Sequence, residues 1–180
     1  MIHRAAREMV LETQGPEAWA AVLAKADLDD AHFISASTYS DEVTQTLLEA
    51  MAQVLAEPVP ALLTAFGRYW VSYVGKGPYG AILRLAGEDV ATILGNLDRL
   101  HEAIRVAMPA ADTPSFQLVG REASELRVIY RSTRAGLEPF VVGLLQGLMA
   151  GCELSPQLVT WASTAQGAEF VLTAPRGRTF

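Results

Sequence analysis

The sequence predicts an α+β domain that is rich in helix over its first two thirds and carries a small antiparallel sheet in its last third. Up to about residue 108, apolar residues recur at helical spacing between glycine and proline breaks. Beyond about residue 115, apolar and polar residues alternate as they do in strands. The chain has 180 residues, of which 51% are hydrophobic, and at this length a buried core needs no disulfide to stabilise it. No linker or repeat divides the chain, so we expect one domain over residues 1–180.

Glycine and proline residues set the predicted helix boundaries. Gly15 ends a first helix and Pro16 begins a second, since proline is favoured at the first helical position. Pro58 ends a third helix that begins near Asp41, and Pro60 begins a fourth. The remaining predicted helices are a short turn or helix at 79–85, a long helix at 88–108 and an apolar, glycine-spaced helix at 136–152.

The last third of the chain predicts two β-hairpins. Apolar Leu126, Val128 and Tyr130 occupy every second position of one segment, which is the period of a half-buried strand. The predicted strand pairs are 115–120 with 124–131, and 158–162 with 169–173. Because strands joined by short turns pair antiparallel, we expect an antiparallel sheet.

The composition excludes several classes of function. With 14 Lys and Arg against 20 Asp and Glu, the net charge is −6, and no basic cluster is available for nucleic acid or an anionic membrane surface. Cys152 is the one cysteine, so we expect a buried thiol and neither a disulfide nor a Cys-rich zinc site. The longest apolar run, at 139–152, is too short to span a bilayer, and Glu8 and Glu12 argue against a signal peptide. We therefore expect a soluble, cytoplasmic protein with no membrane or nucleic-acid partner.

His101 interrupts an apolar stripe on the predicted helix 88–108. The stripe comprises Val90, Ile93, Leu94, Leu97, His101, Ile104 and Met108, and the charged face comprises Asp98, Arg99, Glu102 and Arg105. A buried imidazole needs partners for both ring nitrogens. One interpretation is a core histidine bonded to a carbonyl, and the other is a metal ligand. His3 and His32 lack zinc-ligand spacing, whereas a single inward histidine suits haem, whose porphyrin supplies the other four nitrogens.

A second group of polar residues follows the segment 124–131. Tyr130, Ser132 and Arg134 are each two residues apart, and on extended backbone such residues point the same way. Two hydroxyls and a guanidinium suit one or two carboxylates, because arginine can bind one bidentately. The alternative is a polar strand face in water. The pattern gains weight beside His101, since haem carries two propionates.

Six stretches of the chain, in family order and near-family spacing, carry a resemblance to a known family. They are Gly-Pro-Glu-Ala-Trp (15–19), Ala-Phe-Gly-Arg (65–68), Ala-Ile-Leu-Arg-Leu-Ala-Gly (81–87), Asn-Leu-Asp-Arg-Leu-His (96–101), Thr-Pro-Ser-Phe (113–116) and Tyr-Arg-Ser-Thr-Arg-Ala-Gly-Leu (130–137). The chain resembles the haem nitric-oxide/oxygen-binding (H-NOX) family, which includes the haem domain of the soluble guanylate cyclase beta subunit.

The resemblance implies an H-NOX-like fold with haem b between two parts. A helical distal part would span about residues 1–60 and a proximal part about residues 61–180. His101 would be the proximal iron ligand, and Pro114 would pack on the macrocycle and help to distort it. Tyr130, Ser132 and Arg134 would hold the propionates.

The resemblance also bears on which gas binds. In family members that hold dioxygen stably, a distal tyrosine donates a hydrogen bond to it. The matching residue here is Phe140, or Pro139 if one residue is gapped, and neither can donate. Other pocket residues implied by the match are apolar: Ile2, Ala6, Val74, Leu144 and Leu145. The chain starts at Met1, further in than family members usually do, and Tyr69, Trp70 and Tyr73 stay open as alternative donors.

The implied function is a gas sensor for nitric oxide and carbon monoxide, and not an enzyme. Nitric oxide bound to ferrous haem would weaken the bond to His101 and so release the helix 88–108. The helix would thus have two states, bound and released, and ligand binding would shift the balance between them. The expected partner is a separate histidine kinase or cyclic-di-guanylate enzyme. An oxygen sensor, a haem enzyme and a haem-free module for another apolar ligand are the alternatives.

Overall fold

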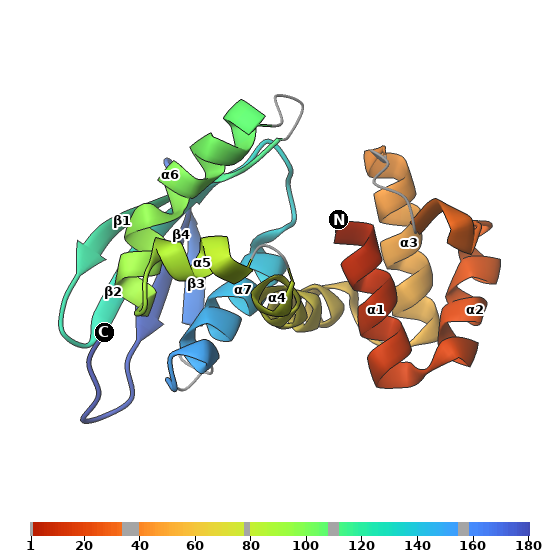
Figure 1. Cartoon of the computed structure of the whole chain (residues 1–180), viewed down its shortest axis with the longest axis horizontal. Helices are drawn as coiled ribbons and strands as arrows, with labels where there is room; N and C mark the ends of the chain where they lie inside the picture. Colours follow the sequence, from red (N-terminus) through yellow and green to blue (C-terminus); the bar gives the residue numbers. More distant parts are fainter. Residues whose placement is uncertain (1, 34–39, 78–79, 108–111, 155–158) are drawn as a thin grey trace.

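The computed structural model describes residues 2–33, 40–77, 80–107, 112–154 and 159–180. Its elements are α1 (Ile2–Gln14), α2 (Pro16–Ala26), the 3-10 helix η1 (Asp30–Phe33), α3 (Asp41–Val54), α4 (Val59–Lys76), α5 (Gly80–Ala86), α6 (Val90–Ala107), β1 (Ser115–Arg121), β2 (Glu125–Arg131), α7 (Glu138–Gly151), β3 (Val159–Thr164) and β4 (Gly167–Thr173). Helices precede the strands along most of the chain, and the predicted α+β class is confirmed (Figure 1).

Helices α1, α2 and α3 form a bundle at one end of the molecule (Figure 1). Val10, Val22 and Phe33 are at most 1% exposed and lie in its apolar cluster. α2 begins at Pro16 after Gly15, whose φ of 87° lies in the region that glycine adopts readily. The bundle therefore has a core of its own.

A polar contact centred on Asp30 joins three elements of this bundle. The Asp30 carboxylate accepts hydrogen bonds from Arg7 Nε at 2.7 Å and Arg7 Nη2 at 3.0 Å. It also accepts one from Trp19 Nε1 at 2.7 Å. The Arg7 guanidinium chiefly holds the pKa of Asp30 below its usual value. This carboxylate ties η1 to α1 and α2.

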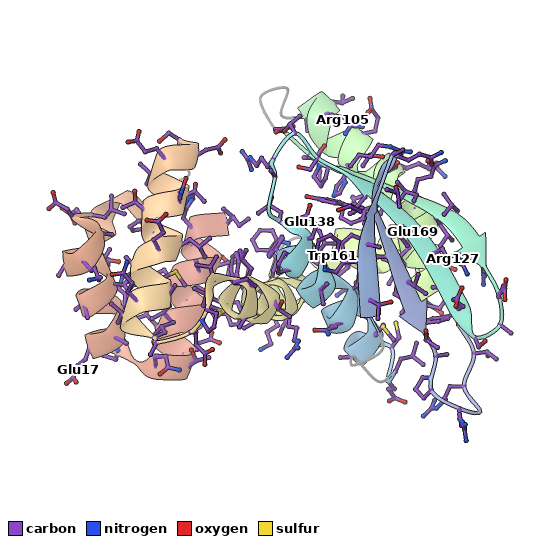
Figure 2. The ribbon with its side chains drawn as sticks, turned by 180° about the vertical axis from the view of Figure 1, so that it is seen from behind. Glu17, Arg105, Arg127, Glu138, Trp161 and Glu169 are labelled. Atoms are coloured by element: carbon purple, nitrogen blue, oxygen red, sulfur yellow. The ribbon has the colours of Figure 1, made fainter. Side chains whose placement is uncertain are left out.

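A four-stranded antiparallel sheet, in the order β1-β2-β4-β3, forms the other end of the molecule. On its inner face Leu126 pairs with Leu172 and Val128 with Phe170, and all four pack in one cluster with residues of α6 and α7. Charged residues of β2 and β4 occupy the other face, where Arg127 Nη1 and Glu169 Oε1 lie 3.9 Å apart (Figure 2). One face of the sheet is thus apolar and covered, as strand alternation requires.

Helix α4 contributes to both apolar clusters. Leu62 and Phe66 belong to the bundle cluster, and Val71 packs against the sheet cluster. α4 also crosses α7 at Gly67 and Gly143, where the two backbones touch. The two parts of the molecule meet along this helix, and the division near residue 60 stays a prediction.

Some element ends differ from those that the sequence predicts. α6 begins at Val90 and not at 88, because the Asp89 carboxylate caps it by accepting a hydrogen bond from Thr92 N at 2.9 Å. The second hairpin is longer than predicted, since β3 reaches Thr164 and β4 begins at Gly167. η1 was not predicted, because so short a helix shows no periodicity. The predicted ends at Tyr79, Met108 and Leu158 lie outside the described residues.

Within the described ranges, no single helix is long and apolar enough to cross a membrane. α3 and α4 meet a length-and-composition criterion only as a pair, and they are bent by 105° at the break between them.

Candidate functional site

His101 lies on α6, but the apolar stripe that contains it is not buried along its whole length. Val90, Ile93 and Leu94 are at most 6% exposed, whereas His101 and Ile104 are half-buried. The expectation of a fully buried imidazole is therefore wrong. The first half of α6 lies in the core of the sheet part, and the second half is covered less completely.

The imidazole of His101 has a defined orientation. Its Nδ1 lies 2.8 Å from the carbonyl oxygen of Pro114. Because a carbonyl only accepts, Nδ1 carries the proton in the neutral ring, and Nε2 keeps its lone pair. Burial lowers the pKa of His101, and this effect outweighs the opposing one of the Pro114 carbonyl. The ring is thus held neutral with one nitrogen available to a metal, the arrangement usual for metal-ligating histidines.

Two further side chains of α6 hold the segment that carries Pro114. Asp98 Oδ1 accepts from the Phe116 backbone N–H at 2.6 Å, and Asp98 Oδ2 accepts from the Ser115 hydroxyl at 2.9 Å. Arg105 Nη1 donates to Thr113 Oγ1 at 2.8 Å. Asp98 and Arg105 were expected on a charged face apart from His101, and this expectation is wrong. Their spacing of three and four residues from His101 puts all three on one face of the helix, and that spacing was the available signal.

The structure brings Tyr130, Ser132 and Arg134 together at the end of β2. Tyr130 is 5% exposed, and burial is the main cause of its raised pKa, which the nearby Ser132 side chain partly offsets. Ser132 Oγ accepts from the Arg134 backbone N–H at 3.0 Å. The Arg134 guanidinium instead reaches α3, where its Nη2 lies 3.3 Å from Asp41 Oδ1.

Phe116 connects the histidine with this polar group. Its ring centroid lies 5.8 Å from that of His101 and 5.1 Å from that of Tyr130. Phe116 is 4% exposed, so it forms a fixed wall between them. The sequence alone does not single out Phe116, because a phenylalanine in a strand is usually a core residue.

The residues expected on the distal side come from α1, α4 and α7. Phe140, in the first turn of α7, is half-buried and packs on Phe66 of α4 with ring centroids 5.4 Å apart. The other expected residues differ in exposure: Ala6 and Leu145 are buried, Val74 and Leu144 are half-buried, and Ile2 is 38% exposed. The apolar character expected of this side is present at each position.

The tyrosines considered as alternative donors are turned toward charged residues of α1. Burial is the main cause of the raised pKa of Tyr69, and the Glu12 carboxylate adds to it. Burial also raises the pKa of Tyr73, with Glu8 adding to the effect. Trp70 stacks on Tyr73 with centroids 6.0 Å apart. Carboxylates of α1 therefore lie near both tyrosines.

Comparison with known proteins decides the family. A sequence model described as haem-NO-binding matches residues 1–152. The chain belongs to the haem-NO-binding (H-NOX) family.

Curated relatives of this H-NOX chain are soluble guanylate cyclases. Soluble guanylate cyclase gcy-35 of Caenorhabditis elegans is 28% identical over 149 residues, which cover 81% of this chain and 22% of that protein. Soluble guanylate cyclase 89Da of Drosophila melanogaster is 24% identical over 143 residues, covering 79% of this chain and 21% of that protein. The chain spans about a fifth of the length of these relatives.

Solved structures show the same fold. The unliganded Fe(II) H-NOX protein of K. algicida superposes with a TM-score of 0.80 at 19% identity, covering 99% of this chain and 97% of that one. An H-NOX protein of S. oneidensis in the Fe(II)NO state gives 0.78 at 18% identity, covering 97% and 98%. The H-NOX of Shewanella woodyi in the Fe(II)CO state gives 0.77 at 21% identity, covering 98% and 95%.

The donor set of this H-NOX chain fits a haem better than an isolated metal ion. Among the described residues no group of three or more His, Cys, Asp or Glu could hold a metal, so a metal at His101 needs its remaining ligands from a macrocycle. Tyr130 and Ser132 supply hydroxyls and Arg134 a cation for carboxylates, at a site that shares Phe116 with His101.

Cys152 is half-buried, and its Sγ lies 3.7 Å from the Glu88 carbonyl oxygen. Burial raises the pKa of this thiol. A protonated thiol is a poor metal ligand and nucleophile, so the donor set of the site does not include Cys152.

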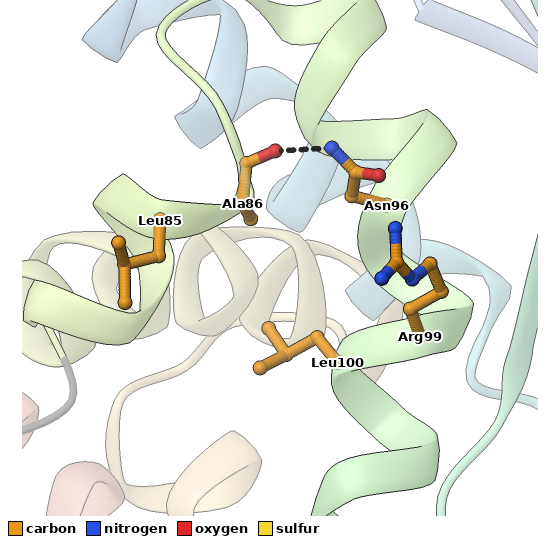
Figure 3. Close-up of a pocket in the computed structure, with 5 residues that line it drawn as sticks. All are labelled: Leu85, Ala86, Asn96, Arg99 and Leu100. Carbon is orange, nitrogen blue, oxygen red and sulfur yellow. Dashed lines mark hydrogen bonds between the residues drawn. The ribbon is translucent and has the colours of Figure 1, made fainter.

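A separate hollow of about 290 Å³ lies between α5 and α6 (Figure 3). It is lined by Leu85, Ala86, Asn96, Arg99 and Leu100, and Asn96 Nδ2 donates to the Ala86 carbonyl at 2.8 Å across it. Leu100 directly precedes His101, and successive residues of a helix point about 100° apart. The predicted site residues do not line this hollow.

Proposed function

We propose that this chain is a gas-sensing domain that binds nitric oxide and carbon monoxide at ferrous haem b and signals to a separate protein. The observation that carries the proposal is the orientation of the His101 ring, whose Nδ1 is hydrogen-bonded to the Pro114 carbonyl oxygen at 2.8 Å. That bond leaves Nε2 as a lone-pair donor in a chain whose family is haem-NO-binding. The Fe(II)NO and Fe(II)CO states of the S. oneidensis and Shewanella woodyi proteins support the choice of gases.

Each residue of the site has one proposed task. His101 would hold the iron through its Nε2 lone pair, and Pro114, whose carbonyl accepts from Nδ1, would lie against the macrocycle. Tyr130, Ser132 and Arg134 would hold the propionates through two hydroxyls and a guanidinium. When bound, the haem supplies the iron position at which a diatomic gas binds.

The distal residues favour some gases over others because their side chains contain no hydrogen-bond donor. Phe140 has no hydrogen-bond donor, and Pro139 lacks even a backbone N–H. Ile2 and Leu144 add apolar surface. Dioxygen needs a donor for the negative charge on its outer atom, whereas nitric oxide and carbon monoxide need little help. The side chains on this side therefore favour nitric oxide and carbon monoxide.

The signal is proposed to leave through α6. With haem bound, His101 would hold α6 through the iron. Release of His101 would allow α6 to shift, and the hydrogen bonds of Asp98 and Arg105 would carry that shift to the start of β1. A histidine kinase or a cyclic-di-guanylate enzyme is the proposed recipient, and the domain itself carries no catalysis.

The test is haem binding by His101→Ala beside wild type. The variant is expected to lose most of its haem after expression with haem supply, and to regain it when imidazole fills the cavity. His3→Gln is the matched control, because glutamine can keep the bond to Thr44 Oγ1, which lies 3.0 Å from His3 Nε2, and it should bind haem normally. An unchanged ferrous spectrum in His101→Ala would show that another residue is the ligand.

A further inference from the structure

One ion pair joins the N-terminal bundle to the sheet part within the residues that the structure describes. It is formed by Arg134 Nη2, just after β2, and Asp41 Oδ1 at the start of α3, 3.3 Å apart. The other five ion pairs in the described ranges lie within one part or the other. The bundle otherwise meets the rest of the molecule along α4 (Figure 1).

The two ends of Arg134 are held differently. Its backbone N–H donates to Ser132 Oγ at 3.0 Å, which fixes the main chain beside Tyr130. Its side chain is 49% exposed and that of Asp41 is 76% exposed. A long side chain in this environment can exchange one carboxylate partner for another while the backbone stays in place.

Asp41 has an alternative source of stabilisation if it loses Arg134. It occupies the first position of α3, where the helix dipole favours negative charge. Ser40 already caps this helix by accepting a hydrogen bond from Val43 N at 3.3 Å. The helix start therefore does not depend on the ion pair.

We propose that Asp41 is a positioning residue for Arg134, and that it competes with a haem propionate for the guanidinium. This inference rests on the proposed function, in which Arg134 holds a propionate. Two carboxylates on one guanidinium repel each other, so each weakens the other's hold. Asp41 thereby lowers the affinity for haem by holding the guanidinium toward α3.

The experiment compares the rate of haem loss to excess apomyoglobin for wild type, Asp41→Asn and Glu42→Gln. Asp41→Asn should lose haem about two- to fivefold more slowly than wild type, the factor expected when an exposed ion pair of this kind is removed as a competitor. Glu42→Gln is the matched control, because it removes the same charge one residue away and forms none of the ion pairs in the described ranges.

A double variant shows whether Asp41 acts through Arg134. In the Arg134→Ala background, Asp41→Asn should change haem loss no more than Glu42→Gln does, although Arg134→Ala alone should hold haem more weakly. A gain of the same size in both backgrounds would show a general charge effect and overturn the inference. If wild type binds haem and Asp41→Asn equals Glu42→Gln, this inference alone fails. If wild type binds no haem, the proposed function fails, and the inference fails with it.

Discussion

The contact between α4 and α7 and the contact between α6 and β1 differ in the groups that form them. α4 and α7 cross so closely that a Cβ on Gly67 would lie 2.2 Å from the Phe140 carbonyl oxygen, and one on Gly143 would lie 2.1 Å from that of Thr64. α6 instead meets the start of β1 through side-chain hydrogen bonds, among them those of Asp98. At the first contact the two backbones touch, whereas at the second, side chains of α6 form hydrogen bonds to the start of β1.

The difference indicates which helix can move. Backbones in van der Waals contact have no slack, so α7 and its Phe140 stay with α4. Hydrogen bonds that a side chain accepts, such as those of Asp98, can lengthen or exchange with water one at a time, at about 1 kcal/mol each. A change at His101 is therefore expected to displace α6 and to leave the distal residues of α7 where they are.

The largest expected effect is that of adding a methyl group at the close crossing of α4 and α7. Gly143→Ala puts a methyl group where no space exists, so the helices must separate, and the free energy of unfolding should fall by about 3 kcal/mol. Gly95→Ala in α6 is the control, because its Cβ would have no neighbour within 4 Å. That change should stabilise the protein by up to about 1 kcal/mol, since alanine is the better helix former. Urea unfolding measures both, and equal effects would contradict the tight crossing.

Removing one carboxylate tests the α6–β1 contact. Asp98→Ala leaves the Phe116 backbone N–H and the Ser115 hydroxyl without their acceptor, so the free energy of unfolding should fall by about 1–3 kcal/mol. Glu102→Ala on the same helix removes only an exposed pair with Arg105 and should change it by less than about 0.5 kcal/mol. Hydrogen exchange of the β1 amides should accelerate in Asp98→Ala alone. A protected β1 in that variant would argue against a hydrogen-bonded clamp.

A hydrogen-bond donor placed on α7 tests whether the distal side chains decide which gas binds. Phe140→Tyr is expected to raise the affinity of the ferrous protein for dioxygen by about fivefold, since one hydrogen bond contributes about 1 kcal/mol. The wild type should form no stable dioxygen complex in air, and spectra of the ferrous protein in air measure both. A stable complex in wild type would require another donor, which Tyr69→Phe and Tyr73→Phe would identify.

The smallest expected effect concerns a polar contact inside the bundle, away from both interfaces. Arg7 holds the pKa of Asp30 below its ordinary value of 3.8. A depressed pKa in the folded state means that the contact stabilises the protein above about pH 4 and is lost as pH falls through the lowered pKa.

Asp30→Asn should therefore lower the free energy of unfolding by about 0.5 kcal/mol at pH 7, a value discounted because both side chains are partly exposed. The difference from wild type should shrink as pH falls below about 4 and Asp30 becomes protonated. Glu17→Gln, an exposed change in the same bundle, should show no such pH dependence. A difference that grows in acid would contradict the sign of the Asp30 shift.

Local pattern and resemblance were sufficient for the order of helices and strands and for the choice of His101 and the group Tyr130, Ser132 and Arg134. Helical periodicity, proline stops and strand alternation act over a few residues, so a single sequence displays them. The sequence by itself thus determined the fold class and the family, and it led to the residues proposed for the site.

Tertiary structure decided which side chains face one another. Asp98 and Arg105 look like solvent-facing charges until β1 is brought against α6, and Asp41 meets Arg134 across 93 residues of chain. Such partners depend on how two elements are placed in space, and no local period encodes that placement. The physical reason is that a polar side chain takes the partner that packing brings within about 3 Å, and packing is settled by the whole core.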